Sequence, residues 1–131
     1  MLKNAFLLAR HAAPGLTSAA STGGALFATV TRLDGAFGFS EKPISKPLAG
    51  ALSGLVKTAA LEWENVRCRA LDIAPDWNDF RQISDRIVSE LIDADLNDAV
   101  EIGIDKEIRT TLGLTRFPVT GEETTALDVN A

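Results

Sequence analysis

Short segments rich in β-favouring residues alternate with longer segments of helical periodicity, and this alternation constrains the fold more than any other feature of the chain. Residues 25–31 (Ala-Leu-Phe-Ala-Thr-Val-Thr) are apolar on both faces, the pattern of a strand buried in a parallel sheet. Residues 67–73 are a second predicted strand, and residues 48–64 are a predicted helix between the two. Strand, helix and strand in this order predict a crossover between parallel strands, which is right-handed in almost every case.

Helices and turns complete the pattern on both sides of this crossover. Residues 3–20 are a predicted helix, which Pro14 either ends or kinks, and residues 21–24 are a turn. The glycine-rich stretch at 34–43 has no periodicity and predicts a loop. Ser45 is a candidate N-cap for the helix that follows, because its hydroxyl can accept a hydrogen bond from the first turn.

The second half of the chain continues the alternation. Residues 79–93 form a second amphipathic helix, with its apolar side chains on one side. Residues 99–104 and 108–112 alternate around a short polar turn, which predicts a hairpin. The sequence opens within a predicted helix, whereas a doubly wound domain normally opens with a strand. We therefore expect part of the fold to be missing from the front of this sequence, or to be supplied by another chain.

Composition excludes several classes of function. The net charge of -5 argues against a nucleic-acid groove or an anionic membrane surface as partner. Cys68 is the only cysteine, so neither an intrachain disulfide nor a cysteine-rich zinc site is possible. No apolar run approaches the length of a membrane span, and no segment has the pattern of a signal peptide, so a cytoplasmic location is expected.

Side chains with chemical potential are few. The chain has no tyrosine, and its single histidine, His11, stands on a predicted helix with no acid placed to orient it, so we expect a surface or boundary histidine. Cys68 lies in a predicted buried strand, where a thiol behaves as a small apolar group. Core packing explains Trp63 and Trp77, which flank the same strand.

Two further features lie where α/β proteins bind ligands. Asp72 and Asp76 lie at the carboxyl end of the strand at 67–73, but two acids without a third ligand predict a solvated strand end better than a metal site. The stretch Gly35-Ala-Phe-Gly38 lacks the Gly-x-Gly-x-x-Gly spacing that cradles a dinucleotide pyrophosphate. We expect it to be a flexible loop.

One segment carries a more specific signal. Residues 52–63 (Leu-Ser-Gly-Leu-Val-Lys-Thr-Ala-Ala-Leu-Glu-Trp), followed by residues 66–73 (Val-Arg-Cys-Arg-Ala-Leu-Asp-Ile), resemble a helix and strand signature of short-chain dehydrogenase/reductase folds. Residues 25–39 are similar to the strand and loop that precede this helix in the same family. The resemblance covers about residues 3–115 and is greatest to the ketoreductase regions of type I polyketide synthases and polyunsaturated fatty acid synthases.

The resemblance implies that the catalytic pair of this family is missing. Active members use a serine near the end of the strand and a Tyr-x-x-x-Lys pair, in which the tyrosine donates a proton to the ketone oxygen and the lysine lowers the tyrosine pKa and holds the cofactor ribose. In this chain Ser45 occupies the position of the tyrosine and Ala49 that of the lysine, while Thr31 or Arg32 falls at the serine. Serine lacks the acidity of a phenol, and alanine has no charge to offer.

Ketoreductases of this kind resemble a doubled fold, in which a structural subdomain precedes the subdomain that binds NADPH. The resemblance therefore implies that residues 1–115 are a truncated Rossmann-like α/β subdomain, with a parallel sheet flanked by helices and a C-terminal hairpin, and that residues 116–131 are a polar linker. It implies no cofactor or metal on this chain itself. The implied partners are the catalytic subdomain of the same parent polypeptide and, indirectly, an acyl carrier protein.

Two other interpretations remain open at this point. One is a divergent reductase that uses Ser45, Lys46 or Lys57 with NADPH, although both lysines are expected to be solvated helix residues. The other is a free-standing module that binds a small molecule or a protein.

Overall fold

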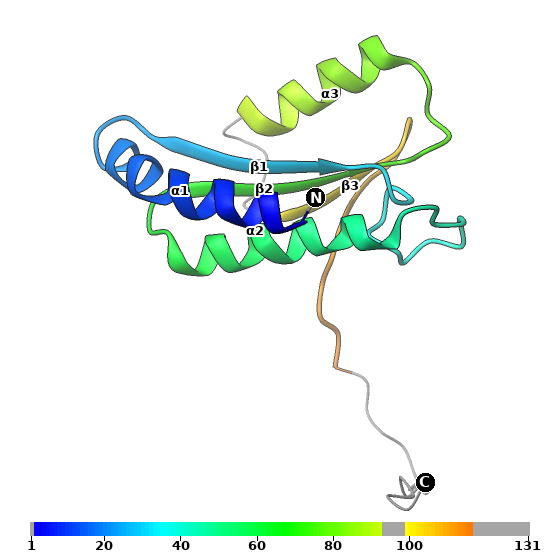
Figure 1. Cartoon of the computed structure of the whole chain (residues 1–131). Coiled ribbons are helices and arrows are strands. Elements are labelled where there is room, and N and C mark those ends of the chain that lie inside the picture. Colours follow the sequence, from blue (N-terminus) through cyan, green and yellow to red (C-terminus); the bar gives the residue numbers. More distant parts are fainter. Residues whose placement is uncertain (1, 93–98, 117–131) are drawn as a thin grey trace, which may run out of the picture.

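A computed structural model describes residues 2–92 and 99–116. The predicted linker at residues 116–131 therefore lies outside the described residues, except for Arg116. The described chain is an α/β structure with a four-stranded mixed sheet flanked by helices (Figure 1). Among the described residues, none of the helices combines the length and apolar character needed to cross a membrane. The elements in chain order are α1 (Leu2–Ala20), β1 (Ala25–Thr31), the 3-10 helix η1 (Pro47–Gly50), α2 (Ala51–Glu62), β2 (Val66–Ile73), α3 (Phe80–Ile92), β3 (Glu101–Ile104) and β4 (Arg109–Thr111).

The strands lie in the order β1-β2-β3-β4. β1 pairs parallel to β2 with Ala25 opposite Val66, β2 pairs parallel to β3, and β3 pairs antiparallel to β4. β1 therefore lies at one edge of the described sheet. The expectation that β1 is a buried strand is wrong, because a strand with a single neighbour keeps one row of backbone groups and part of its side chains in solvent.

Helices cover the two faces of the sheet unequally. α1 and α2 pack on one face, where Val56 and Ala59 contact Cys68 and Ala70 of β2. α3 packs on the other face over β2 and β3 (Figure 1). Its core side chains, Ile83, Ile87 and Leu91, recur every four residues and meet Leu71, Ile73, Ile102 and Ile104.

The two crossovers of this sheet have opposite hands. β1-α2-β2 and β2-α3-β3 step in the same direction across the sheet, but their helices lie on opposite faces. Two crossovers that step in the same direction and have the same hand would place both helices on the same face of the sheet. One of these two crossovers is therefore left-handed, which is rare.

The boundaries of two helices differ from the sequence prediction. α1 continues through Pro14 to Ala20, so the proline does not end it. The helix expected from residue 48 begins instead as η1, whose N-cap is Lys46 and has no side-chain capping hydrogen bond. The N-cap role predicted for Ser45 is therefore wrong, because the chain enters the helix one residue later and Pro47 takes its first position.

Candidate functional site

The carboxyl ends of β1 and β2 form the place where this topology would put a ligand. In open α/β sheets, ligands bind outside the carboxyl ends of neighbouring strands whose connections leave to opposite faces. Here the connection after β1 leads to α2 and the connection after β2 leads to α3, on the other face. The residues that follow these two strands therefore decide whether a crevice is open.

Asp72, near the end of β2, is fully buried and organises this region. The prediction of a solvated strand end is wrong for Asp72, because the carboxylate is enclosed by the loop that follows β1. Its two oxygens accept hydrogen bonds from the Thr31 hydroxyl (2.8 Å) and from the backbone N–H groups of Leu33 (2.7 Å), Asp34 (3.3 Å), Gly35 (2.8 Å) and Phe37 (3.0 Å). The inward-facing amides of this loop thus converge on an anion supplied by the chain itself.

Asp34 holds the second half of the same loop. Its carboxylate accepts hydrogen bonds from the N–H groups of Ala36, Gly38 and Ser40, each at 2.9 Å, and from the Ser40 hydroxyl at 2.7 Å. Burial acts to raise the pKa of Asp34, but these hydrogen bonds outweigh it and hold the pKa well below the usual value of 3.8. The stretch at 35–38, expected to be a flexible loop, is instead fixed by two carboxylates.

Glycine at two positions lets this loop lie directly on the sheet. Gly35 has φ +81°, and a Cβ there would come within 3.0 Å of the Ala74 Cβ. Gly103 in β3 packs against the Gly35 carbonyl, where a Cβ would overlap both the Gly35 oxygen and the Thr110 hydroxyl. The space beside the strand ends is therefore filled by the backbone of the loop.

Two basic side chains tie the strand-end loops together. The Arg32 guanidinium donates hydrogen bonds to the carbonyl oxygens of Pro75 (2.9 Å) and Trp77 (2.6 Å). Lys42 forms ion pairs with Asp76 (3.0 Å) and Asp105 (2.8 Å), which raise the pKa of Lys42, while Lys42 lowers the pKa of Asp105. Asp76 is exposed as expected, and its charge is paired across the loops.

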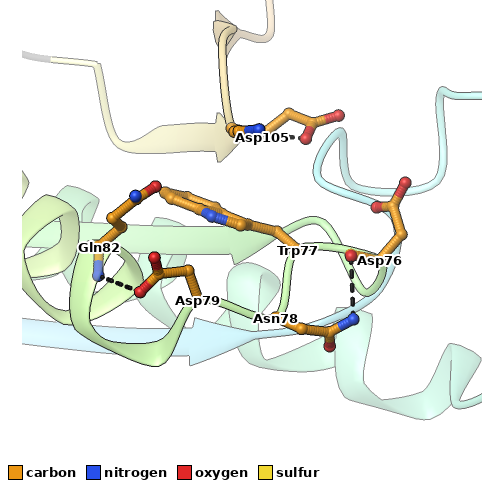
Figure 2. A pocket seen from close by; sticks show the side chains of 7 residues that line it. Asp76, Trp77, Asn78, Asp79, Gln82 and Asp105 are labelled. Carbon is orange, nitrogen blue, oxygen red and sulfur yellow. Dashed lines mark hydrogen bonds between the residues drawn. The ribbon is translucent and has the colours of Figure 1, made fainter.

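A shallow polar hollow of about 350 Å³ lies at the outer end of these loops (Figure 2). Figure 2 shows the Trp77 indole between Asp105 and the start of α3. The Asp79 carboxylate accepts a hydrogen bond from the Gln82 N–H at 3.1 Å, and the Asn78 amide donates to the Asp76 carbonyl at 3.1 Å. The polar groups of the hollow thus serve largely in local turns and in the start of α3. In residues 2–92 and 99–116, no three His, Cys, Asp or Glu side chains are grouped so that they could hold a metal ion.

The residues singled out by the sequence do not assemble into a catalytic group. Ser45 is exposed in the loop before η1, and Ala49 is half-buried in η1. The Thr31 hydroxyl donates to Asp72 and to the Leu71 carbonyl, so it is engaged within the fold. Arg32, the other candidate for the serine position, bridges the two loops as described above.

The other candidates lie apart from the strand ends. His11 is exposed on α1. Cys68 is buried in β2, and burial raises the pKa of its thiol, as expected for an unreactive core cysteine. Lys46 is exposed, and Lys57 is half-exposed and paired with Glu101 at 3.2 Å.

Sequence reasoning missed the central role of Asp72. The available signal was a charged residue between Leu71 and Ile73 in an apolar strand, together with an upstream loop rich in glycine. A carboxylate in such a strand needs hydrogen-bond donors, and a loop with positive-φ glycines is a good source of converging N–H groups.

No protein-family model matches this chain, and comparison with curated proteins and with solved structures gives no match.

Proposed function

We propose that this chain is the non-catalytic structural subdomain of an NADPH-dependent β-ketoacyl reductase, within a synthase that builds polyketides or polyunsaturated fatty acids. The observation that carries this proposal is the filled crevice. The loop after β1 closes the strand-end site on Asp72, where a reductase would need open space for nicotinamide and ketone. A Rossmann-like subdomain organised in this way supports a neighbour and leaves the chemistry to it.

The residues at the family's catalytic positions favour the same role. Ketone reduction needs a proton donor of suitable acidity beside the hydride acceptor. Ser45 offers an aliphatic hydroxyl in an exposed loop, and Ala49 offers no charge to lower its pKa. In the proposed assembly the catalytic subdomain supplies the glycine-rich loop, NADPH and the Tyr-x-x-x-Lys pair, and an acyl carrier protein delivers the β-ketoacyl group to it.

Reconstitution with a catalytic partner tests this proposal. The chain is purified alone and mixed with a catalytic ketoreductase subdomain from a synthase of the same source. Acetoacetyl-CoA serves as the β-ketoacyl thioester, and NADPH oxidation is followed by absorbance. We expect no activity and no nicotinamide-fluorescence change with the chain alone, and higher activity and thermal stability of the catalytic subdomain when the chain is added.

Two results would count against this function. Tight NADPH binding and thioester reduction by the chain alone would make it a divergent reductase. A catalytic subdomain whose activity, stability and elution volume are unchanged by the chain would leave no structural role, and the interpretation as a free-standing binding module would replace it.

A further inference from the structure

The outer edge of β1 lacks the features that usually protect an edge strand from pairing. β1 has seven residues, none of them charged and none of them proline. Edge strands of stable monomers are usually protected by lysine, proline, a bulge or a covering segment, because an unprotected edge pairs with other chains. In the described part of the chain, β1 pairs only with β2.

Apolar side chains flank this edge on the face that α3 occupies. Leu26 lies opposite Arg67 and Val30 opposite Leu71, so both point to the side of the sheet where Leu71 meets α3. α3 covers β2 and β3, however, and leaves Leu26 37% and Val30 44% exposed. A strip of sheet beside α3 is therefore apolar and open.

The opposite face is also apolar at this edge. α1 lies on the same side of the sheet as α2 (Figure 1), and its Leu16 and Ala20 pack, as Phe27 of β1 does, against the buried cluster around Val56 and Cys68. Its first half carries two exposed leucines, Leu7 and Leu8. Exposed apolar side chains therefore occur in both layers that flank the open backbone edge.

A second copy of this chain would cover this surface incompletely. Two β1 strands paired antiparallel about Ala28 would place Leu26 of one copy opposite Val30 of the other. Neither copy has a helix above that strip, because α3 lies over β2 and β3 in each. The leucines and valines of both copies would remain in solvent on that face.

An α/β unit with helices on both sides of its own edge strand would cover the β1 backbone edge, the strip beside α3 and the apolar side chains in the layer of α1. We propose that β1 pairs with an edge strand of such a unit, parallel to β1 as in the rest of the sheet, with one helix of the partner on Leu26 and Val30 beside α3. Parallel sheets are covered on both faces in this way. The inference rests on the proposed function, under which this unit is the catalytic subdomain.

A matched pair of lysine substitutions tests the docking. Val30→Lys places a charge at the edge, and Ile108→Lys places the same charge in the turn between β3 and β4, at the opposite side of the sheet, where Ile108 is 60% exposed. Both side chains are exposed enough for the chain to fold, which circular dichroism and urea unfolding check. We expect Val30→Lys to weaken binding of the catalytic subdomain at least about tenfold, and Ile108→Lys to leave it unchanged. Hydrogen exchange should show slowed β1 amides in the complex.

The outcomes separate this inference from the proposed function. If the catalytic subdomain responds to the chain, but Val30→Lys behaves like Ile108→Lys and the β1 amides exchange as before, the docking surface is wrong and the proposed function stands. If the catalytic subdomain does not respond, both are wrong. If the chain alone sediments as a dimer that Val30→Lys dissociates, the edge takes a second copy and this inference is overturned.

Discussion

Replacing Asp72 with asparagine removes the charge on which the loop after β1 converges. The five hydrogen bonds to Asp72 use both carboxylate oxygens. One carboxylate oxygen accepts from Thr31 and Leu33, and the other accepts from the three N–H groups of Asp34, Gly35 and Phe37. Asparagine has one oxygen and one NH2 group, so the NH2 group must face one of these two sets of donors. The less costly orientation points the NH2 group toward Thr31, whose hydroxyl can rotate to accept, and leaves the Leu33 N–H without an acceptor.

The size of this loss follows from the individual contacts. An orphaned buried N–H costs about 1–3 kcal/mol, and each of the remaining bonds weakens by about 1 kcal/mol when its acceptor becomes neutral. Part of this is offset because a neutral amide is easier to bury than a carboxylate. We expect a net loss of about 3 kcal/mol, a large fraction of the roughly 5–15 kcal/mol that stabilises a typical domain.

Urea unfolding followed by tryptophan fluorescence measures this loss. With an m-value of about 2 kcal/mol/M, the unfolding midpoint of Asp72→Asn should fall by about 1.5 M. Asp85→Asn is the control, because Asp85 is exposed on α3 and the same chemical change there should move the midpoint little. A midpoint for Asp72→Asn close to that of Asp85→Asn would refute the view that this carboxylate holds the loop.

Three further predictions concern the same framework. Gly103→Ala should lower the unfolding free energy by about 1–3 kcal/mol, because its Cβ overlaps Gly35, whereas Gly54→Ala, with open space on α2, should raise it by about 0.5–1 kcal/mol in the same urea titration. The stabilisation that accompanies the lowered pKa of Asp34 is complete above about pH 4 and is lost as the pH falls toward the folded-state pKa. Asp34→Asn should therefore flatten the fall in unfolding free energy at acid pH, and an unchanged fall would contradict this. Cys68 should react with a thiol reagent only at the rate of unfolding, and fast labelling of the native chain would show that β2 opens locally.

Most elements of the fold could be predicted because their signals are local. The apolar spacing of Ile83, Ile87 and Leu91 produces one helical face whatever lies beside it. The β-favouring run from Ala25 to Thr31 likewise forms a strand in the structure. Helix starts are harder, since a single residue such as Pro47 moves the boundary away from Ser45.

The candidate site depended on contacts between distant parts of the chain. The burial of Asp72 requires the loop from Leu33 to Phe37, more than thirty residues upstream, to fold back over the end of β2. Neither segment contains the information that the other will supply its hydrogen-bond partners. From the sequence alone, a charged residue at a strand end is therefore predicted to be exposed to solvent. Only the tertiary structure shows that hydrogen-bond donors surround it.

The sequence by itself determined the alternation of strands and helices, the absence of a tyrosine, and serine and alanine at positions 45 and 49. Only the tertiary structure decided that β1 lies at the edge of the sheet and that α2 and α3 cover opposite faces. The physical reason is that backbone periodicity is set by neighbouring residues, whereas strand order, exposure and the filling of a crevice are set by which distant surfaces exclude water from one another.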